Sequence, residues 1–305
     1  MNGSDFIIHT LGCKVNQVES FHLAEVLTEA GYRPAAPGEK AHVTVVHSCA
    51  VTSRAGFETR QLLRRARRGN PRGKVVVIGC DVHVEAERLA AEQLATHILG
   101  NGEKFDLLQW LSQNGSFENP CIAVRNARSL RVFREIRPRG TGGGRSRAIL
   151  KVQDGCNAFC TYCIVPHTRG CSRSLPVDVV REQLHRYLQQ GCQEVVLSGI
   201  HLGQWGRDLD TGLSLSALLR RLREGVLPPR IRLSSLEPLE FTAELLQELR
   251  KTPGLCPHFH IPLQSGDNDI LKAMHRPYGV EIYRELILQL HEEFPDAAIG
   301  GRCGS

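Results

Sequence analysis

The chain has 305 residues, of which 41% are hydrophobic, so it can bury ordinary cores and form two domains. No apolar run reaches the roughly 18 residues that a membrane helix needs, and the N-terminus lacks the basic start and apolar stretch of a signal peptide. The net charge of +6 is modest and matters only where basic residues cluster. These features predict a soluble, cytoplasmic protein, in which the 11 cysteines are expected to be metal ligands or catalysts rather than disulfides.

The first part of the chain, residues 1–114, alternates short apolar runs with helical segments. Val- and Ile-rich runs predict strands at Asp5–Thr10, His42–Cys49, Lys74–Cys80 and His97–Gly100. The segments between them predict helices at Asn16–Ala30, Thr52–Arg68 and Val82–Ala95. This alternation predicts an α/β domain with a parallel sheet covered by helices.

Three cysteines occupy equivalent places in this pattern. Cys13 follows the first predicted strand, Cys49 ends the second and Cys80 ends the third. The carboxyl ends of parallel strands lie on one edge of a sheet, so three thiols that are distant in sequence are expected to meet there. The alternative is three unrelated buried cysteines, since Cys packs well in cores.

An arginine-rich segment joins the two halves of the chain, and we expect a linker over residues 115–147. Residues 125–147 contain eight arginines and one acid, Glu135. The segment is either a solvated linker or a contact for a phosphate backbone, for which the candidate residues are Arg125, Arg128, Arg131 and Arg134. A second basic group lies upstream and strengthens the case for a polyanionic partner: Arg60, Arg64, Arg65, Arg67, Arg68, Arg72 and Lys74.

The strand–helix alternation resumes in residues 148–305 with a longer period. Strands are predicted at Ala148–Gln153, Glu194–Ser198, Arg230–Ser234 and His258–Leu263. Helices are predicted at Asp178–Gln190, Leu215–Glu224, Thr242–Lys251 and Val280–Glu293. Four or five βα units in a row indicate a full or partial barrel.

A compact cysteine motif follows the first strand of this barrel. Cys156, Cys160 and Cys163 are spaced C-x-x-x-C-x-x-C. A zinc site completed by His167 is one interpretation, but structural zinc prefers four protein ligands. A 4Fe–4S cluster held by three thiolates leaves one iron open for a substrate or cofactor. The spacing favours the radical S-adenosylmethionine (SAM) superfamily, in which SAM occupies the open iron.

Polar residues near the carboxyl ends of the barrel strands are the candidates for binding this cofactor. They are Tyr162, Ser198, Gly199, Ser235, Glu237 and Gln264. For each residue a structural role, such as a βα turn or a helix cap, is an equally good interpretation.

With both cysteine trios in view, residues 5–299 closely resemble the methylthiotransferases. The branch acting on N6-threonylcarbamoyladenosine in tRNA is the most similar. The motifs that carry the resemblance are "TLGCKVNQVES" (Thr10–Ser20), "HSCAVT" (His47–Thr52), "GC" (Gly79–Cys80), "GCNAFCTYCIVPHTRG", "GIHLG", "SSLEP" and "PHFHIPLQSGDNDILKAMHR" (Pro257–Arg276). One departure is His47, which stands where the family usually has asparagine and could change the hydrogen bonds near the thiols.

The resemblance implies an enzyme with two 4Fe–4S clusters. Cys13, Cys49 and Cys80 match the ligands of an auxiliary cluster, and Cys156, Cys160 and Cys163 match those of the radical cluster. It further implies that the enzyme adds a methylthio group to C2 of N6-threonylcarbamoyladenosine at position 37 of tRNA. One SAM molecule methylates sulfur at the auxiliary cluster and a second generates the radical. An electron donor such as flavodoxin or ferredoxin is implied, and a monomer is expected.

The family pattern usually continues into a completed barrel and a small RNA-binding β-barrel. Here the chain turns after Ile299 into "GGRCGS", so we expect a C-terminally truncated chain with weak or no catalysis. The alternatives are a methylthiotransferase for isopentenyladenosine in tRNA, one for a ribosomal protein, or a non-catalytic iron–sulfur or zinc protein that binds RNA. The other cysteines match no ligand position and are expected to be structural: Cys121, Cys171, Cys192, Cys256 and Cys303.

Overall fold

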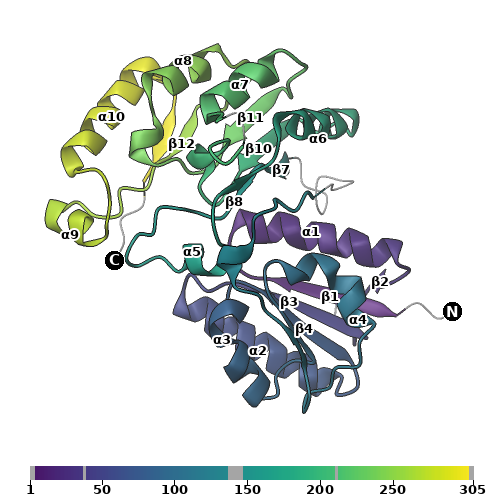
Figure 1. The fold of residues 1–305 in the computed structure, drawn as a ribbon. Helices are drawn as coiled ribbons and strands as arrows, with labels where there is room; N and C mark the ends of the chain where they lie inside the picture. The colour runs from purple at the N-terminus through teal and green to yellow at the C-terminus, as the bar shows by residue number, and fades with distance from the viewer. Residues whose placement is uncertain (1–3, 37–38, 137–146, 210–211, 302–305) are drawn as a thin grey trace. The chain divides into compact units, whose positions relative to one another are not determined.

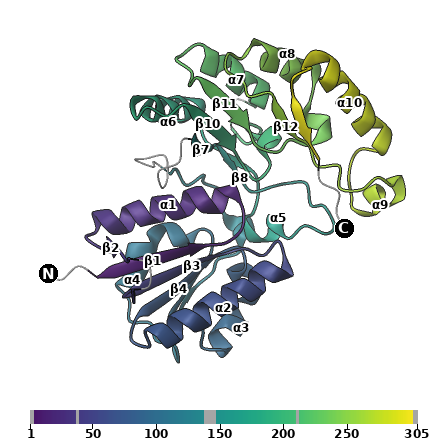
Figure 2. The same ribbon diagram turned by 180° about the vertical axis from the view of Figure 1, so that it is seen from behind.

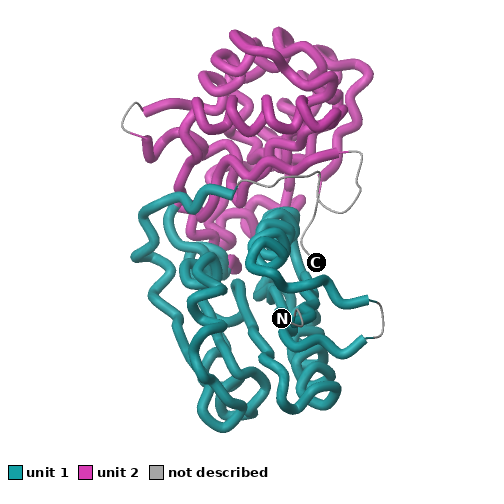
Figure 3. Tube along the Cα trace, turned by 90° about the vertical axis from the view of Figure 1, so that its right-hand side faces the viewer, with its two compact units in different colours: residues 1–139, 164–171 teal, residues 140–163, 172–305 magenta. Residues whose placement is uncertain are grey.

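The computed structural model describes residues 4–36, 39–136, 147–209 and 212–301, and the structural statements below concern these residues. Two compact units are present, one of residues 1–139 and 164–171 and the other of residues 140–163 and 172–305 (Figure 3). Part of the predicted linker, including its glycine run, lies outside the described residues, as do Cys303 and the rest of the final tetrapeptide.

Unit 1 is built on a six-stranded parallel sheet with the strand order β2–β1–β3–β4–β5–β6. The strands are β1 (Asp5–Thr10), β2 (Arg33–Pro34), β3 (Val43–Ser48), β4 (Lys74–Gly79), β5 (His97–Leu99) and β6 (Cys121–Ala123). The central strands β3 and β4 are buried over nearly their whole length, as expected for a parallel sheet covered on both faces. The predicted parallel α/β architecture is confirmed.

Helices cover the two faces of this sheet (Figures 1 and 2). Side chains alternate along β4: Val76 and Ile78 pack with Leu23 of α1 (Lys14–Glu29), whereas Val75 and Val77 pack on the opposite face. That second face is covered by Leu63 of α2 (Ser53–Gly69) and Leu89 of α3 (Val82–Ala91). The period of two in the strand therefore produces two separate apolar cores.

Local chemistry fixes the ends of the helices in unit 1. The Thr52 hydroxyl accepts a hydrogen bond from the Ala55 amide (3.2 Å) and caps the start of α2. Helix α3 ends at Ala91, four residues earlier than predicted, because Gln93 takes a left-handed backbone conformation with φ of 52°.

The short elements α4 (Leu107–Leu111) and α5 (Val165–Thr168) were not predicted, since they carry too few residues to show a period.

Unit 2 contains five parallel strands in two groups. Strands β7 (Arg147–Lys151), β10 (Glu194–Ser198) and β11 (Arg230–Leu233) form one group, and β12 (His258–His260) and β13 (Ala298–Gly300) form the other. An isolated bridge between Ile231 and Leu255 joins the groups. The strands thus follow one another in chain order, as in a partial βα barrel.

The helices of unit 2 begin and end close to the predicted residues. They are α6 (Val177–Gln189), α7 (Leu215–Arg223), α8 (Ala243–Lys251) and α10 (Val280–Glu293). The short helix α9 (Asn268–Ala273) was not predicted, because six residues are too few to show a clear period. The antiparallel pair of β8 (Gln153–Asp154) and β9 (Arg173–Ser174) brackets the segment that carries the C-x-x-x-C-x-x-C motif. None of the helices in the described ranges combines the length and apolar character needed to cross a lipid bilayer.

Candidate functional site

The first cysteine trio lies at the carboxyl edge of the sheet in unit 1. Cys13, Cys49 and Cys80 follow β1, β3 and β4, which are neighbours in the sheet. Gly12 has φ of 93°, and a Cβ atom there would lie 2.8 Å from Cys49 Sγ, so the chain approaches Cys49 as closely as glycine permits. Burial raises the pKa of Cys49, and the charges of Cys80 and Cys13 raise it further. The three thiols therefore share one electrostatic environment.

Two buried amides hold the segments that carry these thiols. Asn16 Nδ2 donates to Leu11 O (2.8 Å) and Ser48 O (3.0 Å), which joins the ends of β1 and β3. Asn101 Nδ2 donates to Thr168 O (2.8 Å) and to Cys80 Sγ (3.6 Å). The carboxyl edge that carries Cys13, Cys49 and Cys80, here called the cysteine edge, is thus fixed by side-chain hydrogen bonds as well as by the sheet.

A network of buried charges adjoins this edge. Glu19 Oε2 accepts hydrogen bonds from Lys104 Nζ (2.6 Å) and Arg169 Nη2 (3.0 Å), and all three side chains are at most 2% exposed. Arg169 Nη2 also donates to Asn16 Oδ1 (2.6 Å). The positive charge of Arg169 lowers the pKa of Cys49 and partly offsets the effect of burial. The network therefore links the cysteine edge to buried cations that favour thiolates.

His47, the departure from the family pattern, belongs to this network. Its Nδ1 lies 2.8 Å from Ser20 Oγ, and its Nε2 lies 3.6 Å from Glu19 Oε2. These contacts join the ring to α1, and Lys104 Nζ lies 3.5 Å from the same Nε2.

We predict that Glu19→Gln destabilises unit 1 strongly. Breaking a buried ion pair leaves a buried charge uncompensated, and the cost is about 3–5 kcal/mol. The measurement is the free energy of unfolding in urea, with the exposed Glu87→Gln as the matched control. Equal stability of the two variants would contradict the prediction.

His83 makes the cysteine edge sensitive to acid. Burial lowers the pKa of His83 to about 4, although the nearby Glu103 opposes this shift. The neutral ring accepts a hydrogen bond from the Asn101 amide at Nε2 (3.0 Å). Because the folded-state pKa lies below the ordinary 6.5, this contribution to stability is complete above pH 6.5 and is lost as pH falls towards 4.

We predict a loss of roughly 3 kcal/mol in the free energy of unfolding between pH 6.5 and pH 4 from this residue. The His83→Gln variant should show a shallower pH dependence than the wild type in urea titrations at several pH values. The exposed His291→Gln serves as the control and should keep the wild-type slope. A His83→Gln slope equal to that of the wild type would refute the assignment.

The second cysteine trio lies on an irregular loop of unit 2. Phe159 adopts φ of 49°, a rare conformation for an aromatic residue, and turns the loop between Cys156 and Cys160. The Cys163 amide donates to Cys160 O (2.9 Å), and the Ala158 amide donates to Cys156 Sγ (3.4 Å). Hydrogen bonds within the motif thus curl the three cysteines into one short loop.

Two basic side chains from elsewhere in unit 2 contact these thiols. Arg276 Nη1 donates to Cys160 Sγ (3.2 Å), and His201 Nδ1 lies 3.2 Å from Cys156 Sγ. Burial alone would lower the pKa of His201, but hydrogen bonds with Cys156 and Glu240 raise it to about 9. The thiols of this loop are therefore placed among positive charges, which favours the thiolate form that metals require.

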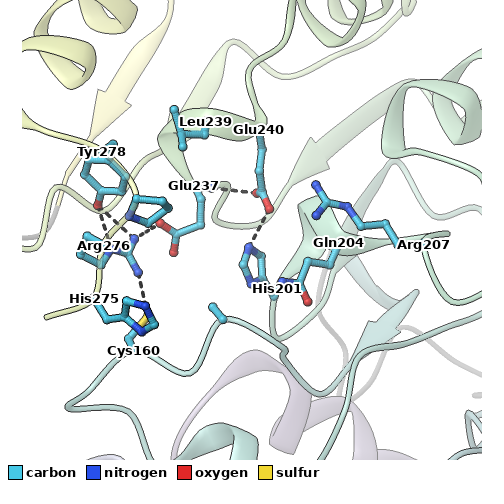
Figure 4. Close-up of a pocket in the computed structure, with 12 residues that line it drawn as sticks. Cys160, His201, Gln204, Arg207, Glu237, Leu239, Glu240, His275, Arg276 and Tyr278 are labelled. Carbon is cyan, nitrogen blue, oxygen red and sulfur yellow. Dashed lines mark hydrogen bonds and ion pairs between the residues drawn. The ribbon is translucent and has the colours of Figure 1, made fainter. Parts of the chain in front are cut away.

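A pocket of about 570 Å³ opens beside Cys160 (Figure 4). It has two ion pairs on its wall, one between Arg276 and Glu237 and the other between His201 Nε2 and Glu240 Oε1 (2.6 Å). The volume suits a ligand the size of a nucleoside joined to an amino acid. Charges of both signs on the wall can contact the amino and carboxylate groups of such a ligand.

The predicted cofactor residues are distributed unevenly around this pocket. Glu237 lines it, and Tyr162 lies near the thiols, where burial raises its pKa to about 12. Ser198 is buried at the end of β10, Gly199 packs against Gln153, and Ser235 Oγ lies 2.7 Å from His260 Nδ1. Gln264 takes a left-handed conformation with φ of 70°. These roles remain predictions.

Sequence reasoning did not single out most of the pocket wall. The residues that it missed are Ala158, His201, Gln204, Arg207, Leu239, Glu240, His275, Arg276, Pro277 and Tyr278. His201 and Arg276 lie inside quoted motifs, "GIHLG" and "KAMHR", and charged residues in loops after barrel strands were the available signal.

The four arginines predicted to contact RNA have partners within unit 1. Arg125 pairs with Glu103, and Arg134 Nη2 lies 3.4 Å from Asp106 Oδ2. Arg131 Nη1 approaches Cys171 Sγ (3.8 Å), and the Arg128 amide donates to Asn126 Oδ1 (2.9 Å). Arg125 and Arg134 are still 65% and 50% exposed, so contact with a polyanion stays a prediction.

The described ranges contain no preformed group of three or more His, Cys, Asp or Glu side chains arranged around a metal position. The donor chemistry nevertheless fits iron–sulfur ligation, since each trio offers three thiols beside basic groups. No disulfide involves the other cysteines of the described ranges, which are Cys121, Cys171, Cys192 and Cys256.

Comparison with known families agrees with this architecture. Residues 150–302 match the radical SAM superfamily, and residues 5–100 match the uncharacterized protein family UPF0004. The structure resembles the radical SAM methyltransferase TsrM of Kitasatospora setae, with a TM-score of 0.67 and 13% identity over 99% of this chain and 67% of that chain. At that identity the likeness concerns the fold alone.

Sequence relatives define the family more narrowly. The chain is 36% identical to threonylcarbamoyladenosine tRNA methylthiotransferase MtaB of Bacillus subtilis, over 95% of this chain and 64% of that protein. It is 35% identical to MtaB of Aquifex aeolicus, over 95% of this chain and 70% of that protein. It is 34% identical to tRNA-2-methylthio-N(6)-dimethylallyladenosine synthase of Moorella thermoacetica, over 96% of this chain and 67% of that protein.

The chain therefore belongs to the radical SAM methylthiotransferase family. Membership implies SAM and a 4Fe–4S cluster as cofactors. The chain spans about two thirds of the length of the curated relatives that it matches.

Proposed function

We propose that this protein is a tRNA methylthiotransferase that adds a methylthio group to C2 of N6-threonylcarbamoyladenosine at position 37. The observation that carries the proposal is the presence of two separate cysteine trios, each beside basic groups, in a chain whose relatives are named for this reaction. Relatives named for the dimethylallyladenosine reaction supply the second candidate.

Cys156, Cys160 and Cys163 would hold the radical cluster. When bound, this cluster supplies the electron that cleaves SAM reductively. Arg276 and His201 keep positive charge beside Cys160 and Cys156, and the ion pairs on the pocket wall orient a charged ligand next to that loop. Tyr162, Ser198, Gly199, Ser235, Glu237 and Gln264 would complete the cofactor contacts.

Cys13, Cys49 and Cys80 would hold a second 4Fe–4S cluster. When bound, that cluster supplies the site at which sulfur is methylated. Asn16 and Asn101 hold the thiol-bearing segments, and Arg169 supplies positive charge beside them. The partners in the proposal are tRNA and an electron donor such as flavodoxin or ferredoxin, acting on a monomer in the cytoplasm.

The two trios should separate two halves of the chemistry. We predict that Cys160→Ala abolishes formation of 5′-deoxyadenosine, because it removes a ligand of the cluster that cleaves SAM. Cys49→Ala should retain 5′-deoxyadenosine formation but lose methylthiolation. Each variant should hold about four irons, against about eight for the wild type, after anaerobic reconstitution.

Cys192→Ala is the matched control, since this buried cysteine belongs to neither trio. It should retain about eight irons and both products. Mass spectrometry of nucleosides from reconstituted reactions distinguishes the threonylcarbamoyl substrate from the dimethylallyl substrate. Zinc in place of iron, or loss of both activities only in Cys192→Ala, would refute the proposal.

We predict that Arg276→Gln weakens SAM binding by about tenfold or more, because a charge-assisted hydrogen bond contributes about 1.5–3 kcal/mol. The dissociation constant is measured by equilibrium dialysis with the reconstituted chain. Arg220→Gln removes an exposed arginine that is paired with Glu244 and should leave the constant unchanged. Unchanged SAM affinity in Arg276→Gln would remove this residue from the cofactor site.

A further inference from the structure

Helix α2 carries a row of exposed residues that the site described above does not use. Phe57, Gln61, Arg65, Arg68 and Arg72, here called the α2 stripe, follow one another at spacings of three or four residues. Phe57, Gln61, Arg65 and Arg68 lie within the helix, where this spacing puts them on one face, and all five residues are exposed. Arg72 is included because it lies only three residues beyond the end of the helix at Gly69.

The arginines of the stripe differ from the other arginines of the same helix. Arg64 Nη2 donates to Glu92 Oε2 (2.8 Å), and Arg67 Nη1 donates to Gln93 O (2.8 Å), so these two are engaged with α3 and the turn that follows it. In the described part of the chain, no carboxylate or carbonyl accepts a hydrogen bond from the guanidinium groups of Arg65, Arg68 or Arg72. Their donors are free for an external anion.

Apolar surface adjoins this charge at the other end of the helix. Phe57 is 53% exposed, and Val51, which precedes the helix cap, is 60% exposed. An aromatic side chain in line with arginines is typical of surfaces that bind RNA, where rings stack on bases and guanidinium groups bind phosphates. A helix face that only interacts with water would explain the exposed arginines but not the exposed ring of Phe57.

The two ends of the α2 stripe lie at different distances from the cysteine edge. Helix α2 follows β3, so its first residues lie at the carboxyl edge of the sheet, where Cys49 directly follows that strand. A backbone hydrogen bond from Val51 lowers the pKa of Cys49, which places Val51 against the thiol, although burial dominates and raises that pKa overall. Phe57 is therefore at the end near the cysteine edge, and Arg68 is about 16 Å farther along the helix.

We propose that the α2 stripe binds the anticodon arm of tRNA. Arg65, Arg68 and Arg72 contact phosphates of the stem, and Phe57 stacks on an unpaired base of the loop, at the end that faces Cys49. This proposal rests on the proposed function for its partner, and it adds a contact surface in unit 1 to the arginines of residues 125–134. Charge complementarity and the exposed ring favour RNA over an acidic protein.

The test is binding of an unmodified tRNA transcript to the reconstituted chain, measured by fluorescence anisotropy at several salt concentrations. The Arg65→Glu/Arg68→Glu variant should bind at least about tenfold more weakly, and its log Kd should depend less steeply on log salt by about 1.5, since two phosphate contacts are lost. The control Arg221→Glu/Arg284→Glu makes the same charge change at exposed arginines of unit 2 and should bind like the wild type.

A second variant separates stacking from charge. Phe57→Ala should weaken binding of a hairpin with the anticodon-arm sequence by roughly 5- to 100-fold, with an unchanged salt slope. It should bind the same stem as a blunt duplex with wild-type affinity. Thermal unfolding checks that these surface variants fold like the wild type.

The outcomes distinguish this proposal from the proposed function. If the wild-type chain binds tRNA and the Arg65→Glu/Arg68→Glu variant binds it with the same affinity, the proposal for the α2 stripe is wrong but the tRNA substrate is not. If that variant keeps its RNA affinity but loses affinity for flavodoxin, the stripe binds an acidic protein and the proposal is wrong. A wild-type chain that binds no tRNA overturns both the stripe and the tRNA substrate.

Discussion

The arrangement of unit 1 depends on one constraint of parallel sheets: every strand delivers its carboxyl end to the same edge. Cys13, Cys49 and Cys80 are separated by more than thirty residues along the chain, yet each follows or ends one of three neighbouring strands. The alternation of Val75–Ile78 between two apolar cores fixes the register of β4. A slip of one residue would expose those cores and move Cys80 away from the other thiols.

Electrostatics at this edge depends on buried charge rather than on surface charge. Glu19 holds Lys104 and Arg169 without exposure to solvent, and Arg169 in turn holds Asn16 beside Cys13. Screening by salt is weak for buried charges, so the effect of Arg169 on the pKa of Cys49 should depend little on ionic strength. Arg169 follows the second cysteine trio by only six residues in sequence but folds within unit 1, so one short segment contributes to the cysteine edge of that unit.

The two trios reach similar chemistry by different routes. In unit 1 the thiols are gathered by regular strands, and their amide and charged neighbours come from distant parts of the sequence. In unit 2 the motif supplies all three thiols within one loop, and Arg276 and His201 arrive from later loops of the barrel. In both cases basic groups lie beside the sulfur atoms, which favours the thiolate state.

Most long elements were predictable, because β1 and β10 contain short runs of Val, Ile and Leu, and α10 has an apolar stripe of helical period; all three occupy the predicted residues. The short elements β2, β6, α4 and α5 were not, because a few residues cannot show a period. The pairing of the arginines at 125 and 134 with Glu103 and Asp106 was equally invisible, since ion pairs between distant residues leave no local pattern.

The sequence by itself determined which side chains are available: two cysteine trios, the order of strands and helices, and the family motifs. These follow from local spacing, which is written directly in the chain. Only the tertiary structure decided which groups meet, such as Arg276 with Cys160, Glu19 with Arg169, and the exposed face of α2 with no internal acceptor in the described residues. Burial and contact across long separations depend on how the packed elements fill space, and that is a property of the folded chain.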